Sequence, residues 1–159
     1  MTVDDLLARE GIRHTIASYN MAGDSRNAAE FVALFADDAV LEFAGFPPLQ
    51  GFRFQGREAI DPIPRWRQYA EMEKALGGSS FLRHNLTTCR IELTGPETAK
   101  ARTYFVVFTD IGPDHCGVYT DELVRRGDRW LFAHRKIRLD WRAPESLFPV
   151  VDKGAVKAK

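Results

Sequence analysis

The stretch CGVYTDELVRRGDRWLFAHRKIRLDW, residues 116–141, decides the fold. Two runs rich in β-branched and aromatic residues flank the dipeptide Gly127-Asp128, an arrangement typical of a β-hairpin. The second run, from Arg129 to Trp141, alternates in side-chain character as a strand with one buried face does. The sequence therefore predicts a long antiparallel hairpin at this end of the domain.

The hairpin closes a longer β-rich region. We expect four strands, at residues 81–93, 98–110, 116–126 and 129–141, separated by the turns GPE, IGPD and GD. Sequential strands joined by short turns pair with their neighbours, so the four strands predict an antiparallel meander.

Helical patterns precede these strands. Apolar residues at helical spacing predict helices at residues 3–22 and 27–35, and a third at 57–76 that is interrupted by its prolines. Between the second and third helices we expect a short strand at 39–43. It leads into GFPPLQGFRFQG, residues 45–56, which we expect to be irregular and to close over a cavity.

Three helices followed by a meander predict an α+β fold, a cone-shaped curved antiparallel sheet closed by three N-terminal helices with a ligand pocket inside. We expect one domain at residues 1–149, and a flexible tail at 150–159 because that segment is polar.

Charge and composition exclude several classes of protein. The 159 residues hold 22 basic and 22 acidic side chains, a balance that argues against nucleic-acid or anionic-membrane binding. No apolar run approaches the length of a membrane span, so we expect a cytoplasmic protein. Cys89 and Cys116 do not form a CxxC pair and are expected to be free thiols.

The last strand carries a charge on its apolar face. Alternation places Arg135 with Ile137 and Leu139, and a buried guanidinium requires a partner. It is either an ion pair with Asp121 that stabilises the fold, or a clamp for a carbonyl or anionic oxygen of a substrate. The opposite face of this strand includes Trp130 and Phe132 and is expected to be exposed apolar surface, which favours a homodimer or homotrimer.

Three further residues are candidates for catalysis. His84 shares a strand face with Leu82 and Leu86, and Asp24 follows the inward-facing Tyr19 near the end of the first helix. If that helix crosses the sheet, Tyr19, Asp24 and His84 meet Arg135 in one cavity, where a carboxylate-bound imidazole acts as a general base. The alternatives are a core histidine, a helix-cap aspartate and an ordinary core tyrosine.

Aromatic and acidic residues on the central strands are candidates for substrate binding. Tyr104 and Phe108 are expected to line the pocket, although aromatic residues in strands are often simple core. Tyr119 and Asp121 share one strand face and complete the set.

A cofactor is not expected. His115 beside Cys116 supplies only two metal donors next to a turn, and neither GxGxxG nor GxxxxGK[ST] occurs. The sequence therefore predicts chemistry without metal or nucleotide.

Three segments resemble the SnoaL-like branch of the nuclear transport factor 2-like superfamily. They are IRHTIASYNMAGDSRNAAEFVALFADDAVLEF (12–43), FLRHNLTTCRIEL (81–93) and GVYTDELVRRGDRWLFAHRKI (117–137). This superfamily includes scytalone dehydratase, bile-acid 7α-dehydratase, ketosteroid isomerase and hexachlorocyclohexane dehydrochlorinase, as well as non-catalytic binding domains.

The resemblance implies a site. In the bile-acid dehydratase and the dehydrochlorinase, an aspartate ending the first helix, a histidine opening a strand and an arginine in the last strand act together, and Asp24, His84 and Arg135 match them. Tyr19 stands where the dehydrochlorinase has a lysine, which favours C–O over C–Cl elimination.

Together, residues and resemblance predict a cofactor-independent lyase (dehydratase) or isomerase that abstracts a proton from an apolar cyclic, polyketide-like or steroid-like carbonyl compound. A non-catalytic small-ligand-binding or oligomerisation domain is one alternative. An epoxide hydrolase or cyclase of the same fold is another.

Overall fold

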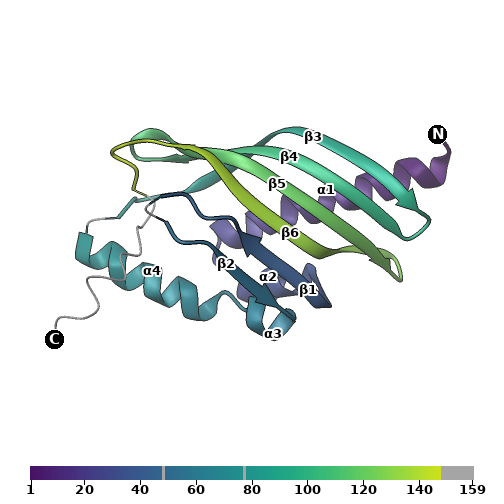
Figure 1. Ribbon diagram of the computed structural model, residues 1–159, viewed down its shortest axis with the longest axis horizontal. Coiled ribbons are helices and arrows are strands. Elements are labelled where there is room, and N and C mark those ends of the chain that lie inside the picture. The colour runs from purple at the N-terminus through teal and green to yellow at the C-terminus, as the bar shows by residue number, and fades with distance from the viewer. Residues whose placement is uncertain (48, 77, 148–159) are drawn as a thin grey trace.

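The computed structural model describes residues 1–47, 49–76 and 78–147, which form a curved six-stranded sheet and four helices (Figure 1). The strand order is β2-β1-β6-β5-β4-β3. The strands are β1 Phe35–Phe43, β2 Phe52–Gln55, β3 Arg83–Gly95, β4 Thr98–Thr109, β5 Gly112–Arg126 and β6 Arg129–Arg142. The helices are α1 Val3–Asp24, α2 Ala28–Ala33, α3 Arg57–Ile60 and α4 Ile63–Leu76. The expected tail at 150–159 lies outside the described residues.

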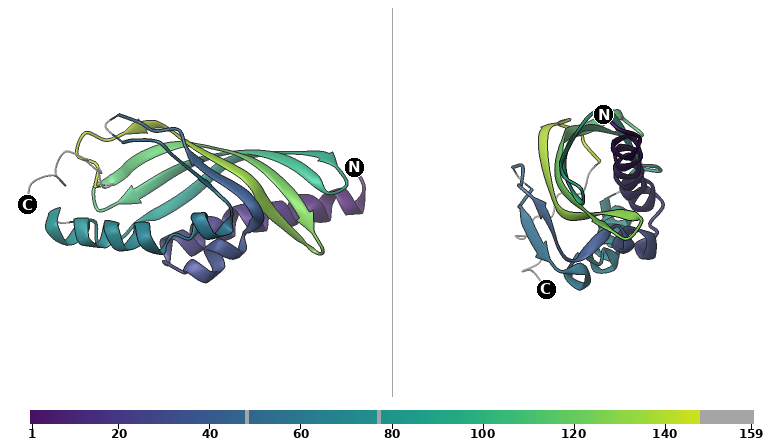
Figure 2. Two further views of the ribbon diagram at one scale, coloured as in Figure 1. Left: turned by 60° about the horizontal axis from the view of Figure 1, so that its bottom comes forward. Right: turned by 90° about the vertical axis from the view of Figure 1, so that its right-hand side faces the viewer.

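Helix α1 lies along the concave side of the sheet (Figure 2). It begins at a capping box, in which Asp5 N donates to Thr2 Oγ1 and Thr2 N donates to Asp5 Oδ2. Farther along, Thr15 Oγ1 donates to the carbonyl of Trp130 at 2.7 Å. A Cβ at Gly11 would lie 2.9 Å from Trp130 Cδ1, so a glycine is needed there for the helix to approach β6 this closely.

The sheet is mixed, which corrects the expectation of a wholly antiparallel sheet, and it is open. Strand β1 pairs with β6 in parallel, with Leu41 opposite Arg135. A parallel pair needs a long connection, and the chain from β2 to β5 provides one. In the described part of the chain the edge strands β2 and β3 do not pair with each other.

The segment between β1 and β3 also differs from expectation. The stretch GFPPLQGFRFQG, expected to be irregular, contains β2, which pairs antiparallel with β1. The expected third helix is two helices, because Asp61 before Pro62 has an extended ψ of 120°. The residue before a proline is sterically disfavoured in helical conformation, so α3 ends there and α4 starts anew.

An extra residue in β6 changes which side chains face inward. The pairing of β6 with β5 shifts at Ala133, between Phe132 and His134. Such a bulge reverses the alternation on one side of it. Trp130 and Phe132, expected on an exposed face, are therefore buried with exposed fractions of 4% and 0%, while Arg135 still faces inward.

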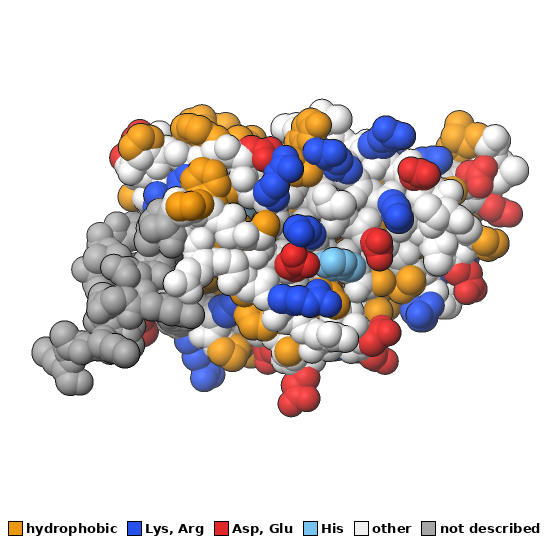
Figure 3. All heavy atoms as spheres, in the orientation of Figure 1, with side chains coloured by type: hydrophobic (Ala, Val, Ile, Leu, Met, Phe, Trp, Pro, Cys, Tyr) orange, Lys and Arg blue, Asp and Glu red, His pale blue; other side chains and the backbone are white. Residues whose placement is uncertain are grey.

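The outer surface is mixed in charge. On the face shown in Figure 3, basic and acidic side chains are interspersed. Large apolar side chains exposed on strands include Tyr104, Phe108 and Trp141. Among the described helices, none has both the length and the apolar character of a membrane span.

Candidate active site

A cavity of about 520 Å³ lies on the concave side of the sheet. Its wall is largely apolar, as in most small-molecule sites of this size. The 45–56 segment contributes to it, as expected. The lining residues include Phe31, Leu41, Phe43, Leu49, Phe52, Phe54, Trp66, Leu82, Phe105, Ile137 and Leu139.

Asp24 and His84 meet in the wall of this cavity. The Asp24 carboxylate binds His84 twice, with Oδ1 2.6 Å from Nδ1 and Oδ2 accepting from the backbone N–H at 2.9 Å. These contacts offset the unfavourable position of a carboxylate at the C-terminal end of α1, where the helix dipole is negative. With Nδ1 on the carboxylate, Nε2 is the ring atom turned away from Asp24.

Tyr19 also lines the cavity. Its ring packs on Phe31 at a centroid distance of 4.8 Å and stands edge-on to Tyr119 at 5.9 Å. Burial raises the pKa of both tyrosines, so both hydroxyls remain protonated near neutral pH and act as hydrogen-bond donors.

Arg135 and Asp121 form the buried ion pair that the sequence offered as one alternative. Arg135 Nε and Nη2 donate to the two Asp121 oxygens at 2.8 and 2.7 Å, and both side chains are fully enclosed. The guanidinium also lies 4.0–4.2 Å from the ring centroids of Tyr19, Tyr119 and Phe132. Burial lowers the pKa of Arg135, but the Asp121 carboxylate outweighs this effect and the pKa is raised.

This placement differs from the expected catalytic clamp. Arg135 and Asp121 are not among the cavity-lining residues, whereas Tyr19 and Tyr119, which pack on the guanidinium, are. The ion pair therefore supports the rings that line the cavity and does not itself face a ligand.

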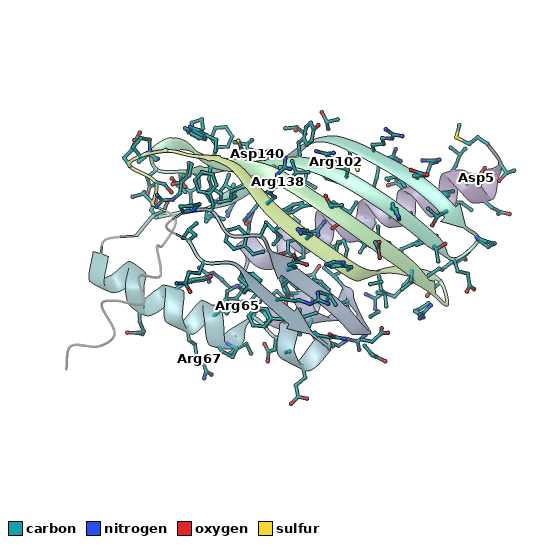
Figure 4. All side chains as sticks on the ribbon, in the orientation of Figure 1. Asp5, Arg65, Arg67, Arg102, Arg138 and Asp140 are labelled. Carbon is teal, nitrogen blue, oxygen red and sulfur yellow. The ribbon has the colours of Figure 1, made fainter. Side chains whose placement is uncertain are left out.

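Tyr104 and Phe108 do not line the cavity, so their expected role in the pocket is wrong. Both are exposed, by 45% and 37%, because the inward residues of β4 are Phe105 and its odd-numbered neighbours. Tyr104 packs under Arg102 on the outer face of the sheet, in a shallow depression that also includes Arg138 (Figure 4).

His115, which lines the same cavity, belongs to a second Asp–His pair. His115 Nδ1 lies 2.7 Å from Asp114 Oδ1, and His115 is only 2% exposed. Burial lowers the pKa of His115, with a further lowering from nearby His84. His115 lies on the same face of β5 as Tyr119. Its inward orientation was not predicted, because the expected strand began at residue 116 whereas β5 begins at Gly112.

Helix α4 supplies an arginine that the sequence analysis did not single out. Arg65 lies on the side of α4 toward the sheet, and Arg67 on the other side (Figure 4). The Arg65 guanidinium lies 4.5 Å from the Phe54 ring centroid and donates to the Ile60 carbonyl. Arg65 lines the cavity, as does Arg26, whereas Arg135 does not.

Metal-binding clusters are absent from the described part of the chain. Within residues 1–47, 49–76 and 78–147, no group of three or more His, Cys, Asp or Glu side chains is placed to hold a metal ion. His115 is instead engaged with Asp114 and not with Cys116.

Solved structures share this fold. A scytalone dehydratase-like protein from Novosphingobium aromaticivorans is 20% identical, with a TM-score of 0.68 and 100% of both chains covered. A hexachlorocyclohexane dehydrochlorinase from Novosphingobium barchaimii is 19% identical, with a TM-score of 0.67 over 89% of this chain and 92% of its own. A cystatin-like protein of unknown function from Nostoc punctiforme is 18% identical, with a TM-score of 0.66, covering 87% and 92%.

Sequence comparison gives the family. No curated protein sequence matches the chain. The family model described as a SnoaL-like domain matches residues 4–136, which span both Asp–His pairs and the Arg135–Asp121 ion pair. The chain therefore belongs to the SnoaL-like domain family, with a fold of the nuclear transport factor 2-like type.

Proposed function

We propose that the protein is a cofactor-independent lyase or isomerase that removes a proton α to the carbonyl group of an apolar cyclic compound. The observation that carries the proposal is the Asp24–His84 pair, joined at 2.6 Å, in the wall of a largely apolar cavity. An imidazole oriented by a carboxylate is a common general base. Solved structures of this fold include proteins named as a dehydratase and a dehydrochlorinase, which supports elimination chemistry.

The first step moves one proton. His84 Nε2 takes the proton from the α-carbon, and the electron pair of the broken C–H bond forms an enolate. Asp24 stabilises the imidazolium that results, because its carboxylate already holds Nδ1. General-base catalysis of this kind accelerates a reaction by about 10²–10⁴-fold.

The second step distinguishes a dehydratase from an isomerase. In a dehydratase the enolate expels a β-hydroxyl group, which leaves with the abstracted proton as water. In an isomerase the proton returns to another carbon. Tyr19, protonated and in the cavity wall, is the donor we assign to the substrate oxygen, and Arg135 is a positioning residue that holds the Tyr19 ring.

Deuterium exchange tests the first step without knowledge of the natural substrate. Cyclic ketones, including 1-tetralone, are incubated with the protein in D₂O, and the loss of α-proton signal is followed by NMR. We expect exchange above the buffer rate with the wild type and a decrease of about 10²–10⁴-fold with His84→Ala.

His134→Gln is the matched control. His134 is bonded to Glu42 on the outer side of the sheet at 3.2 Å, so its replacement leaves the cavity unchanged. Exchange should be the same in this variant as in the wild type. If no ketone in the set exchanges faster with the wild type than with His84→Ala, the proposal is wrong.

A ligand-binding domain without chemistry is the second candidate. It is favoured by the Arg135–Asp121 ion pair, because Arg135 is bound to Asp121 and does not line the cavity, where it would contact a substrate. A domain of this kind binds 1-tetralone but does not exchange its α-protons, so the same experiment separates the two candidates.

A further inference from the structure

Asn20 is a buried polar residue in the cavity wall that the proposed mechanism does not use. It is 5% exposed and lies on α1 between Tyr19 and the end of the helix. Its Oδ1 accepts a hydrogen bond from the Tyr119 hydroxyl at 3.2 Å. Its Nδ2 is buried and has no hydrogen-bond partner among the described residues.

The position of this amide is fixed by its surroundings. The Tyr119 ring stacks on Phe105 at 4.3 Å with an interplanar angle of 16°, and the Arg135 guanidinium lies 4.2 Å from its centroid. Because the Tyr119 hydroxyl is thereby held in place, Asn20 keeps Oδ1 on that hydroxyl and directs Nδ2 elsewhere. A buried N–H group without an acceptor costs free energy, so an incoming oxygen atom stabilises this arrangement.

Asn20 and Asp24 lie on the same face of α1. Residues four apart in a helix are neighbours, with Cβ atoms about 5–6 Å apart. Asp24 holds His84, so the Asn20 amide lies one helical turn from the carboxylate that carries the base, and all three residues line the cavity. This spacing suits a small molecule whose acceptor oxygen and acidic C–H group lie on adjacent carbon atoms.

We propose that Asn20 Nδ2 donates a hydrogen bond to the carbonyl oxygen of the substrate and so positions its α-carbon at His84. The inference rests on the proposed function and narrows its substrate class to cyclic ketones. The amide donates a hydrogen bond to one oxygen atom, and the apolar part of the cavity wall packs against the rest of the ring system. Among cavity-lining residues, Asn20 is thus a specificity-determining residue that neither the sequence analysis nor the family assignment points to.

The test compares two ligands that differ in the carbonyl group. Binding of 1-tetralone and of tetralin, its carbonyl-free counterpart, is measured for the wild type and for Asn20→Leu. We expect Asn20→Leu to weaken 1-tetralone binding roughly tenfold, the value of one hydrogen bond, and to leave tetralin binding within about twofold. The ¹³C resonance of carbonyl-labelled 1-tetralone should lie downfield in the wild-type complex and shift back in the variant.

A second variant controls for a loss of stability in Asn20→Leu. Asn20→Leu leaves the Tyr119 hydroxyl without its acceptor, whereas Asn20→Leu/Tyr119→Phe replaces both partners with apolar groups, a change that is close to neutral for stability. The double variant should show the same loss of preference for 1-tetralone. Asn85→Ala, a substitution of an exposed asparagine on β3, is the matched control and should bind both ligands as the wild type does.

The outcomes separate this inference from the proposed function. If His84→Ala abolishes exchange but retains the carbonyl shift and the 1-tetralone preference, both stand. If the preference is Asn20-dependent but the wild type exchanges no α-protons, the inference stands as a binding site and the proposed function fails. If the wild type binds 1-tetralone no better than tetralin, or both Asn20 variants keep the preference, the inference is overturned whatever the exchange rates are.

Discussion

Two Asp–His pairs with nearly the same hydrogen bond lie at the cavity, one with both residues in its wall and the other with its histidine alone. Asp24 lies 2.6 Å from His84 and Asp114 lies 2.7 Å from His115, in both cases through Nδ1. Their exposure differs, because the side chains of the first pair are 10% and 24% exposed and those of the second 0% and 3%. The first pair is open to a ligand, and the second is part of the packed interior.

The remaining partners of each carboxylate explain this difference. Among the described residues Asp24 bonds only to His84, through its ring and its backbone. Asp114 also accepts hydrogen bonds from the Thr109 hydroxyl at 3.1 Å, the Ser146 hydroxyl at 2.5 Å and the Leu147 N–H at 2.7 Å. The same two types of side chain thus border the cavity in one case, and in the other they fasten the segment after β6 to the end of β4 and the start of β5.

Asp24→Asn should give the largest effect on activity. The amide cannot stabilise an imidazolium as a carboxylate does, so we expect α-proton exchange to fall about 10²–10⁴-fold. The free energy of unfolding should fall by only about 1–2 kcal/mol, because the loss is confined to the bonds with one residue. Exchange followed by NMR and urea unfolding measure the two quantities. If Asp24→Asn is unfolded under the conditions of the exchange measurement, so that unfolding accounts for the lower exchange rate, the catalytic interpretation of this pair is contradicted.

Asp114→Ala should give the largest effect on stability. It leaves the donors on His115, Leu147, Thr109 and Ser146 without their acceptor, and buried donors without acceptors cost about 1–3 kcal/mol each. Since Ser146 and Leu147 reach water more easily than His115 does, we expect a net loss of about 3–5 kcal/mol in urea unfolding. Exchange at a temperature where the variant is folded should fall less than tenfold. A stable variant without exchange would show that the second pair is catalytic.

Much of the fold follows from sequence periodicity. The four long strands begin and end within a few residues of their predicted bounds, and the strand parity that turns His84, Tyr119 and Arg135 inward is correct. The meeting of Asp24 with His84 could be predicted because a helix end and a strand start have defined positions in an α+β arrangement.

The errors arise where a single residue breaks the alternation. The extra residue Ala133 in β6 buries Trp130 and Phe132, and a sequence period of two does not reveal such a bulge. In β4 most inward side chains are small, such as Ala99, Ala101 and Thr103, so a choice based on aromatic side chains selected the outward Tyr104 and Phe108 wrongly.

The second pair was missed for a similar reason. The pairing of β4 with β5 shifts at Asp114, between Pro113 and His115, so two consecutive residues of β5 are buried. Beside a glycine and a proline this segment has the sequence signature of a turn, and only its contacts across the sheet reveal a strand. Asn20 was missed because a buried asparagine in a helix carries no sequence signature of its own.

The smallest expected effect is a pH dependence of stability that belongs to the second pair. Burial lowers the pKa of His115 below its ordinary value of 6.5, while Asp114 opposes this effect and His84 and Arg142 add to it. Below about pH 6.5 the unfolded chain therefore binds a proton that the folded chain does not. The free energy of unfolding is thus highest above that pH and decreases as the pH falls, by at most about 1.4 kcal/mol per pH unit. His115→Gln keeps a donor for Asp114 but does not titrate, so the difference between urea midpoints at about pH 7.5 and about pH 5.5 should be larger in the wild type than in this variant. Equal differences in the two proteins would mean that His115 binds a proton as readily in the folded chain as in the unfolded chain, and the contrast between an open and a structural pair would then be wrong.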